Sequence, residues 1–198
     1  MKNKYSLSET LSTAYALLCT TLFYKGARLV RRPFYCRGKS RLQFDEGFTT
    51  GHHCRFDLLG TDGDKSKKLI IGKNCKLGDN VHIVANEKVI IGDNCLMASR
   101  IFISDTSHGH YSKVATDSSP DIPPDDRLLY MKPVSIGDNV WIGENVCILL
   151  GVKIGDGCII GANSLVNRDV PDNCIVAGSP AKVLKQWNSK LRMWINIV

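Results

Sequence analysis

The sequence predicts an all-β solenoid of short stacked strands, and two periodic features support this prediction. From Ile136 to Val166 an aliphatic residue recurs at every sixth position, and a second small or apolar residue stands two positions before each of them. Glycine often follows the aliphatic residue, and a polar pair such as Asp138-Asn139 comes next. Each unit is therefore a short strand closed by a turn that favours glycine or asparagine. Three units make one triangular coil of about eighteen residues.

The same period continues upstream, where it restarts at Ile71 and, after a slip of two residues, at Ile91. A strand of this kind cannot bury its inward face alone, so the coils must stack on one another. We expect a repeat domain over residues 42–180 with about five coils. The coils cover residues 42–57, 69–86, 89–104, 134–151 and 152–169, with insertions at 58–68 and 105–133.

Residues 1–41 form a basic N-terminal segment, with nine Lys or Arg against the single acid Glu9. This segment carries a charge of +8 and the remainder −1, so the net charge of +7 is concentrated in the N-terminal arm. A nucleic-acid-binding face is not favoured, because no stacking aromatics accompany the arm. The charge-free run from Ser12 to Tyr24 is shorter than the roughly 20 residues that span a bilayer. No cleavage site follows it, so we expect a cytoplasmic protein.

This charge-free run has the spacing of an amphipathic helix. Two partners are open for such a helix. It can pack on the body of the protein, or the basic cluster that follows it can bring it to an anionic membrane at the inner face.

The cysteines and the C-terminal end complete the framework. Cys54, Cys75, Cys95 and Cys158 all stand two positions before an inward aliphatic residue, which predicts small core fillers rather than metal ligands or disulfides. Pro171 and Pro180 close the repeat, and residues 181–198 are predicted to form a capping helix and tail.

The stretch "VSIGDNVWIGENVCILLGVKIGDGCIIGANSLVNRDVPDNCIVAGSPAKVLK", Val134 to Lys185, resembles the C-terminal half of hexapeptide-repeat acyltransferases, such as galactoside and maltose O-acetyltransferases. The insertion "SSPDIPPDDRLLYMKPVSIG" and the basic N-terminus resemble the branch that acetylates bacterial surface polysaccharides. The resemblance implies a left-handed parallel β-helix and a homotrimer with active sites between subunits. It also implies acetyl-CoA as the acyl donor, a sugar hydroxyl as the acceptor and no metal.

Acetyl transfer to a hydroxyl requires a base whose pKa lies near neutrality, and histidine is the usual choice. In the family a histidine stands in the loop between upstream and downstream coils, and "DTSHG" matches that pattern, so the resemblance implies His108 as the base. Asp105 could orient its imidazole, as a carboxylate does in hydrolytic triads. His110 is the alternative base if the loop is aligned differently.

Further site residues concern the two substrates. His82 precedes inward Ile83 and Trp141 precedes inward Ile142, so both face outward, toward solvent, the acceptor cleft or a subunit contact. Asn80 matches the acceptor-binding asparagine of the family. For coenzyme A, the resemblance assigns Ala162 to the pantetheine, Asn167 and Arg168 to the middle of the molecule, and Lys182 and Lys185 to its phosphate and adenine end.

Three other functions remain open from the sequence alone. The acceptor can be a small free molecule, such as an oligosaccharide, an antibiotic or serine. A zinc protein similar to trimeric carbonic anhydrases would use His82, His108 and His110, but the spacing of the last two is poor for zinc. A non-catalytic scaffold is the third.

Overall fold

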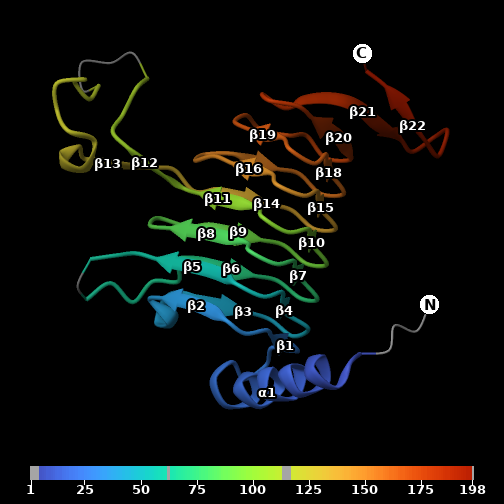
Figure 1. Cartoon of the computed structure of the whole chain (residues 1–198). Coiled ribbons are helices and arrows are strands. Elements are labelled where there is room, and N and C mark those ends of the chain that lie inside the picture. Colours follow the sequence, from blue (N-terminus) through green and yellow to red (C-terminus); the bar gives the residue numbers. More distant parts are fainter. Residues whose placement is uncertain (1–4, 62, 113–116, 198) are drawn as a thin grey trace.

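The computed structural model describes residues 5–61, 63–112 and 117–197, which form one helix and a tall stack of short strands (Figure 1). Helix α1 (Leu7–Phe23) lies across the N-terminal end of the stack, and the C-terminal strands lie at the opposite end. Three sheets, which are parallel except at the C-terminal end of the chain, form the walls of the stack. Before that end, successive strands of the coils pass from one wall to the next. This is a parallel β-helix.

Each wall is a row of strands that follow one another along the stack. The nine-stranded sheet contains β1 (Leu29–Val30), β4 (Thr49–Thr50), β7 (Lys76–Leu77), β10 (Leu96–Met97), β15 (Trp141–Ile142), β18 (Ile159–Ile160), β20 (Cys174–Ala177), β21 (Lys182–Asn188) and β22 (Met193–Asn196). The six-stranded sheet contains β2 (Phe34–Arg37), β5 (Cys54–Leu58), β8 (His82–Ala85), β11 (Phe102–Ser104), β16 (Cys147–Ile148) and β19 (Leu165–Val166). The five-stranded sheet contains β3 (Leu42–Phe44), β6 (Leu69–Ile71), β9 (Val89–Ile91), β14 (Val134–Ile136) and β17 (Lys153–Ile154).

Equivalent residues of successive coils stack in register along each wall. Ile71 pairs with Ile91, which pairs with Ile136, and all three are buried. The four cysteines predicted to fill the core, Cys54, Cys75, Cys95 and Cys158, are at most 1% exposed. The neighbouring residue Ile90 points outward and is 38% exposed. The interior of the stack is therefore one continuous apolar core.

Ile91 and Ile90 allow a direct test of this register. Replacing Ile91 by valine removes a buried methyl group, so we expect the free energy of unfolding to fall by about 1 kcal/mol. The same change at Ile90 should cost less than about 0.5 kcal/mol because that side chain is largely in water. Chemical denaturation of both variants measures the difference. Equal losses would contradict the register.

The turns explain why glycine, aspartate and asparagine repeat. Seven asparagines have positive φ and close turns: Asn74, Asn80, Asn94, Asn139, Asn145, Asn163 and Asn173. A Cβ at Gly78 would lie 2.7 Å from the backbone of Ala98 in the next coil, so a side chain does not fit there. The carboxylate of Asp138 accepts a hydrogen bond from the backbone N–H of Asp93 at 2.7 Å, which ties neighbouring turns together.

The structure differs from the sequence prediction at both ends. β1 and β2 lie inside the segment predicted as a helical arm, and together with β3, which lies in the predicted repeat, they form a coil that begins at Leu29. The predicted C-terminal helix is wrong. Residues 182–188 and 193–196 instead form the antiparallel strands β21 and β22 beside β20. The helix-favouring composition of this segment is overridden because the free edge of β20 offers unpaired backbone groups.

Helix α1 matches its prediction and packs on the first coil. Ser6 caps it with Glu9 in a capping box, and its buried residues include Ala16, Cys19 and Thr20. The hydroxyl of Thr20 accepts a hydrogen bond from the backbone N–H of Val30 in β1 at 2.9 Å. The helix therefore covers the open N-terminal end of the core. Among the described residues, no helix has the length and apolarity required to cross a membrane.

Candidate active site

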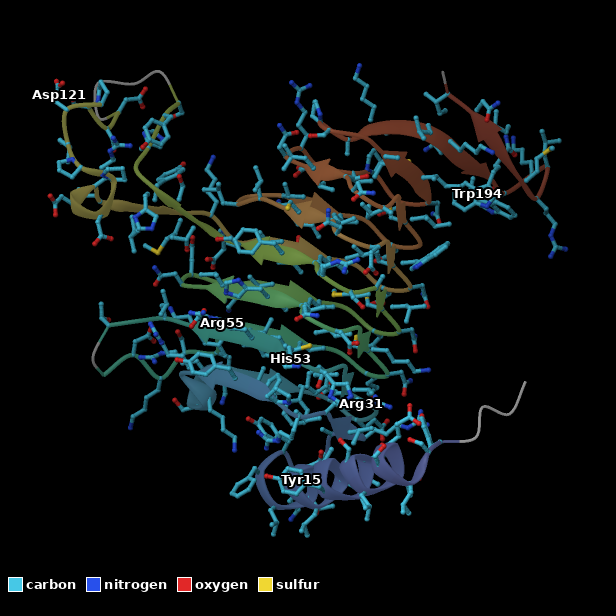
Figure 2. All side chains as sticks on the ribbon, viewed as in Figure 1. Tyr15, Arg31, His53, Arg55, Asp121 and Trp194 are labelled. Carbon is cyan, nitrogen blue, oxygen red and sulfur yellow. The ribbon has the colours of Figure 1, made fainter. Side chains whose placement is uncertain are left out.

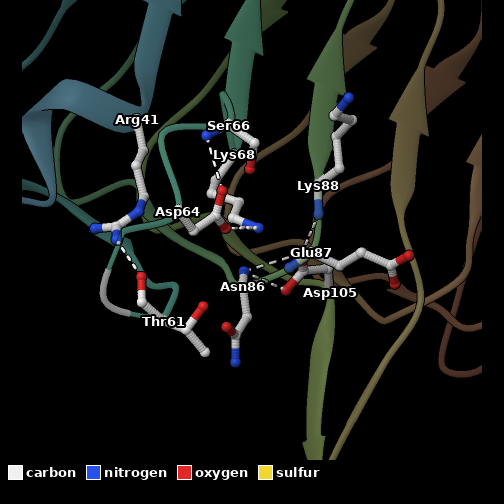
Figure 3. A network of polar contacts seen from close by, with 9 residues as sticks. All are labelled: Arg41, Thr61, Asp64, Ser66, Lys68, Asn86, Glu87, Lys88 and Asp105. Carbon is white, nitrogen blue, oxygen red and sulfur yellow. Dashed lines mark hydrogen bonds and ion pairs between the residues drawn. The ribbon is translucent and has the colours of Figure 1, made fainter.

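The predicted insertion leaves the stack after β11, and Asp105 fixes its root (Figure 3). Asp105 is completely buried, and its carboxylate accepts hydrogen bonds from the backbone N–H groups of Asn86, Glu87 and Lys88 at 2.7 to 3.0 Å. The hydroxyl of Thr106 donates to it as well, at 2.7 Å. The three backbone donors belong to the turn between β8 and β9, in the preceding coil. The carboxylate thus ties the insertion to the stack.

The expected role of Asp105 as a direct partner of His108 is not found. Within the described part of the chain, no hydrogen bond joins the two side chains, and the Asp105 carboxylate already has four donors. A buried carboxylate needs such donors to offset its lost hydration. Spacing in sequence could not show that the nearest backbone donors come from another coil.

The insertion begins and ends as a two-stranded antiparallel hairpin of β12 (Thr106–His108) and β13 (Leu129–Met131). The backbone N–H of Lys132 donates to the carbonyl of Asp105 at 2.9 Å, and the carbonyl of Lys132 accepts from Gly151 at 3.1 Å. Both strands are therefore anchored where they join the stack.

His108 is the last residue of β12, and its side chain is exposed. Its backbone is held by pairing with Leu129 and by a hydrogen bond from the Tyr111 hydroxyl to its carbonyl at 2.6 Å. Arg127 donates to the Tyr111 hydroxyl at 2.7 Å. The described hydrogen bonds include none from the imidazole of His108. The geometry thus combines a fixed backbone with an imidazole free to meet a ligand.

His110 has a different environment. Its ring lies 4.2 Å from the ring of Tyr130, its Nδ1 is 3.2 Å from a carboxylate oxygen of Asp117, and its Nε2 is 2.5 Å from the hydroxyl of Ser112. His110, Arg127 and Tyr130 also line a cavity of about 540 Å³ within the insertion. Because both ring nitrogens are engaged, the structure favours a role for His110 in shaping the insertion.

His82 faces outward from the six-stranded sheet, as expected, and packs against Phe102 with ring centroids 5.4 Å apart. Its Nε2 lies 3.1 Å from a carboxylate oxygen of Asp57, which is also 2.6 Å from Nε of Arg55. Burial opposes ionisation of Asp57, but hydrogen bonds from Arg55 and His82 outweigh it and lower the pKa of the carboxyl group. Arg55 and Asp57 were not predicted from the sequence, although their positions in β5 are register partners of His82 and Val84.

The other two residues predicted on the acceptor side, Trp141 and Asn80, do not lie together with His108. Trp141 projects from the nine-stranded sheet and is 51% exposed, whereas His82 and the root of the insertion belong to the six-stranded sheet. Asn80 has a φ of 57° and closes a turn, as the other repeat asparagines do, and its backbone N–H donates to the carbonyl of His52 at 2.8 Å. Trp141 and His108 therefore lie on different faces of one chain.

The predicted coenzyme A residues lie on the C-terminal coils and are exposed: Ala162, Asn167, Arg168, Lys182 and Lys185. Asn167 and Arg168 follow β19, just as the insertion follows β11, so both leave the stack at the same corner. β11 and β19 are two strands apart, or about 10 Å. Lys182 and Lys185 lie in β21, paired with Ala177 and Ile175 of β20.

The buried cysteines are poorly suited to act as nucleophiles. All eight cysteines lie in the described part of the chain as free thiols. Burial raises the pKa of Cys36 and Cys54 to about 11, and burial also raises the pKa of Cys158 and Cys174. Because the thiolate is the reactive form, these thiols are poor nucleophiles at neutral pH. A hydrogen bond with the Cys95 thiol lowers the pKa of Cys75, but the Cys75 side chain is fully buried. The described residues also contain no group of three His, Cys, Asp or Glu side chains arranged to hold a metal ion.

Comparison with known proteins decides the family. The bacterial transferase hexapeptide family (six repeats) matches residues 133–168, and the hexapeptide repeat of succinyl-transferase matches residues 68–98. One relative is WbbJ of Escherichia coli (strain K12), which is named as an O-acetyl transferase of lipopolysaccharide biosynthesis. It is 38% identical to this chain over 194 residues, which cover 98% of this chain and 96% of that protein. The chain belongs to the hexapeptide-repeat acyltransferases.

Other members of the hexapeptide-repeat acyltransferases support acetyl transfer as the activity. The galactoside O-acetyltransferase of Escherichia coli (strain K12) is 38% identical over 122 residues, or 62% of this chain and 56% of that protein. The structure of a galactoside acetyltransferase with coenzyme A has a TM-score of 0.54 and 34% identity, covering 72% of this chain and 67% of that one. The fold is accordingly the left-handed parallel β-helix, and the protein is an acetyltransferase with acetyl-CoA as its donor.

The same fold is found in a protein of lower sequence similarity. AntD, an N-acyltransferase from Bacillus cereus solved with dTDP and coenzyme A, has a TM-score of 0.64 at 21% identity, with 84% of each chain covered. At this identity the likeness concerns the fold alone.

Proposed function

We propose that this protein transfers an acetyl group from acetyl-CoA to a sugar hydroxyl of a bacterial surface polysaccharide or its precursor, with His108 as the general base. The observation that carries the assignment of the base is the exposed imidazole of His108 on a hairpin whose root is locked by buried Asp105. Such a base must be positioned accurately yet remain accessible to its substrate.

The reaction needs no covalent enzyme intermediate. His108 accepts the hydroxyl proton as the sugar oxygen attacks the thioester carbonyl, and a tetrahedral intermediate forms. When this intermediate collapses, the carbon–sulfur bond breaks and the imidazolium returns the proton to the departing thiolate of coenzyme A. The products are the acetylated sugar and free coenzyme A. The raised pKa values of Cys36 and Cys54 agree with direct transfer.

The donor would lie along the corner that carries the insertion. Asn167 and Arg168 leave the stack there, about 10 Å from the root of the insertion, and would contact the middle of coenzyme A. The backbone of Ala162 would contact the pantetheine. Exposed Lys182 and Lys185 in β21 would attract its phosphates as single charges, without the bidentate geometry of arginine.

A homotrimer would complete the site. Leu96, Trp141, Ile159 and Ile175 are register partners that face outward from the nine-stranded sheet, and Trp141 is half exposed. A row of this kind is costly to leave in water and suits contact with a second subunit. In such a trimer, Trp141 of one subunit could meet His108 of another, although they lie on different faces of one chain.

Replacing Trp141 by glutamate is therefore expected to shift the protein from trimer toward monomer, because the charge would be buried against an apolar partner. Sedimentation velocity measures the mass of both proteins. The control is Ile90→Glu on the five-stranded sheet, which should remain trimeric. A wild-type monomer at assay concentrations, or a trimer unaffected by Trp141→Glu, would contradict the arrangement.

The polysaccharide acceptor is supported by the name of WbbJ, which matches nearly the whole length of this chain. The second candidate is a small free acceptor. It is supported by a chloramphenicol acetyltransferase of Morganella morganii that is 32% identical over 150 residues, or 74% of this chain and 65% of that protein. Since acetyl-CoA is a cytoplasmic metabolite, we place the reaction on the cytoplasmic side.

An acceptor panel tests the choice. Purified protein with radiolabelled acetyl-CoA is offered lipid-linked glycans, deacetylated polysaccharide, free galactosides, chloramphenicol and serine. Acetylation of the glycans with little turnover of the small acceptors supports the proposal. Fast turnover of one small acceptor, with none on glycans, would replace it by the second candidate.

A further inference from the structure

The solvent-facing side of α1 is unusually apolar. Its exposed side chains include Leu7 (78%), Leu11 (63%), Leu18 (59%) and Leu22 (66%), which follow one another at helical spacing. Tyr15 and Phe23 flank this row and are also more than half exposed. A helix that merely packs on its own protein would present charges to water at these positions. The exposed side of α1 between Thr10 and Phe23 carries no charged side chain.

The side of α1 that packs on the protein is a different one. Ala16, Cys19 and Thr20 are buried against the first coil, so the leucine row points away from the stack. In Figure 1 the helix lies crosswise to the direction in which the coils stack. A flat surface below the helix would therefore meet the leucine row along its length, with the coils standing upright on that surface.

Two arginines lie where the helix meets the first coil. Arg31 lines a groove with Tyr5 and Ser8 beside the first half of the helix, and Arg32 lines a groove with Tyr15 and Phe23 beside its second half. Figure 2 shows Arg31 on the side of the helix that faces the stack.

At the end of the helix, Nζ of Lys39 lies 4.5 Å from the centre of the Tyr24 ring and 5.7 Å from that of Phe23, and Lys25 follows exposed. The only acid among the first 41 residues, Glu9, is already bonded to Ser6. Glu9 lines the same groove as Arg31, so the surroundings of the apolar row carry four cations, Lys25, Arg31, Arg32 and Lys39, against one acid.

We infer that α1 lies in the interface of an anionic phospholipid bilayer, with the leucine row among the acyl chains and the exposed cations Lys25 and Lys39 at the phosphates. Apolar burial and attraction to anionic lipid act together in such helices, and one alone gives weak binding. A second copy of the chain would cover the leucines but would bring the same cations face to face. Charge complementarity therefore favours the bilayer.

Vesicle flotation with the full-length protein tests the inference. We expect binding to vesicles of phosphatidylcholine and phosphatidylglycerol in equal parts, and at least ~10-fold weaker binding to phosphatidylcholine alone. The double variant Leu11→Glu with Leu18→Glu should lose at least ~10-fold of the binding to the anionic vesicles. Lys25→Ser with Lys39→Ser should reduce the preference for anionic lipid severalfold, because Arg31 and Arg32 remain. Leu191→Glu, an equally exposed leucine at the opposite end, is the matched control and should bind as the wild type does.

Three results would overturn the inference: no binding of wild type to anionic vesicles, unchanged binding of the leucine double variant, or a leucine-dependent doubling of mass in sedimentation velocity, which would assign the row to a second copy. A thermal melt checks that the variants are folded. None of the substituted residues belongs to the proposed catalytic or coenzyme A site, so acetylation of a soluble acceptor should be unchanged. Loss of acetylation in both wild type and variants would bear on the proposed function and leave the membrane result standing.

Discussion

Replacing His108 by alanine is expected to lower kcat about 10³-fold, because removal of a general base costs roughly 10²- to 10⁴-fold. The imidazole is exposed and makes no described hydrogen bond, so its loss should leave the fold intact. Steady-state acetyl transfer measures kcat, and calorimetry measures coenzyme A binding, which should change less than about twofold because the base does not hold the donor.

His110→Ala is the matched control for this experiment. Since His110 packs on Tyr130 and contacts Asp117, its loss should loosen the insertion and reduce kcat by less than about tenfold. Retention of activity in His108→Ala together with its loss in His110→Ala would move the base to His110. Retention in both variants would exclude a histidine base in this loop.

Replacing Asp105 by alanine is expected to lower the free energy of unfolding by about 4 kcal/mol, because three backbone N–H groups lose a charged acceptor in a buried place. Asp105→Asn keeps the size of the side chain but places an NH₂ group opposite the backbone N–H donors. It should therefore recover little of the stability that Asp105→Ala loses. Chemical denaturation measures both variants.

Asp105 also fixes the root of the His108 hairpin, which makes it a positioning residue. Amide hydrogen exchange should therefore accelerate at residues 86–88 and 106–108 in Asp105→Asn, and kcat should fall more than KM rises. Asp125→Asn, an exposed acid of the same insertion, is the control and should match the wild type. If Asp105→Asn unfolded at the same denaturant concentration as the wild type, the anchoring role would be refuted.

The six-residue period was sufficient to predict the stacked coils from the sequence. Ile71, Ile91 and Ile136 occupy equivalent positions because each coil repeats the same backbone geometry. The ends were harder because they depend on a neighbour. The segment after Pro180 has helical composition but pairs with the open edge of β20. β1 and β2 have too few period-matching residues to be recognised as part of a coil.

Part of the candidate site could likewise be predicted from the sequence, and part could not. The position of His108 after an inward strand was predictable from the chain, and the structure places it on an anchored hairpin. The partners of Asp105 were not predictable, because Asn86, Glu87 and Lys88 lie in the preceding coil and donate through their backbone, which leaves no mark on side-chain spacing. Acceptor contacts from another subunit of the proposed trimer would leave no mark on the spacing within one chain.

The regular rise of the six-stranded sheet has a further consequence for a protein that stands on a bilayer. β2, β5, β8 and β11 follow one another at about 4.8 Å per step, so the root of the His108 hairpin lies about 14 Å above the first coil. In the proposed orientation on the bilayer, the number of coils would then set the height of His108 above the lipid. Sugars close to the lipid anchor of a growing glycan would reach His108, and sugars far along the chain would pass it by, so the number of coils would decide which residue of the glycan is modified.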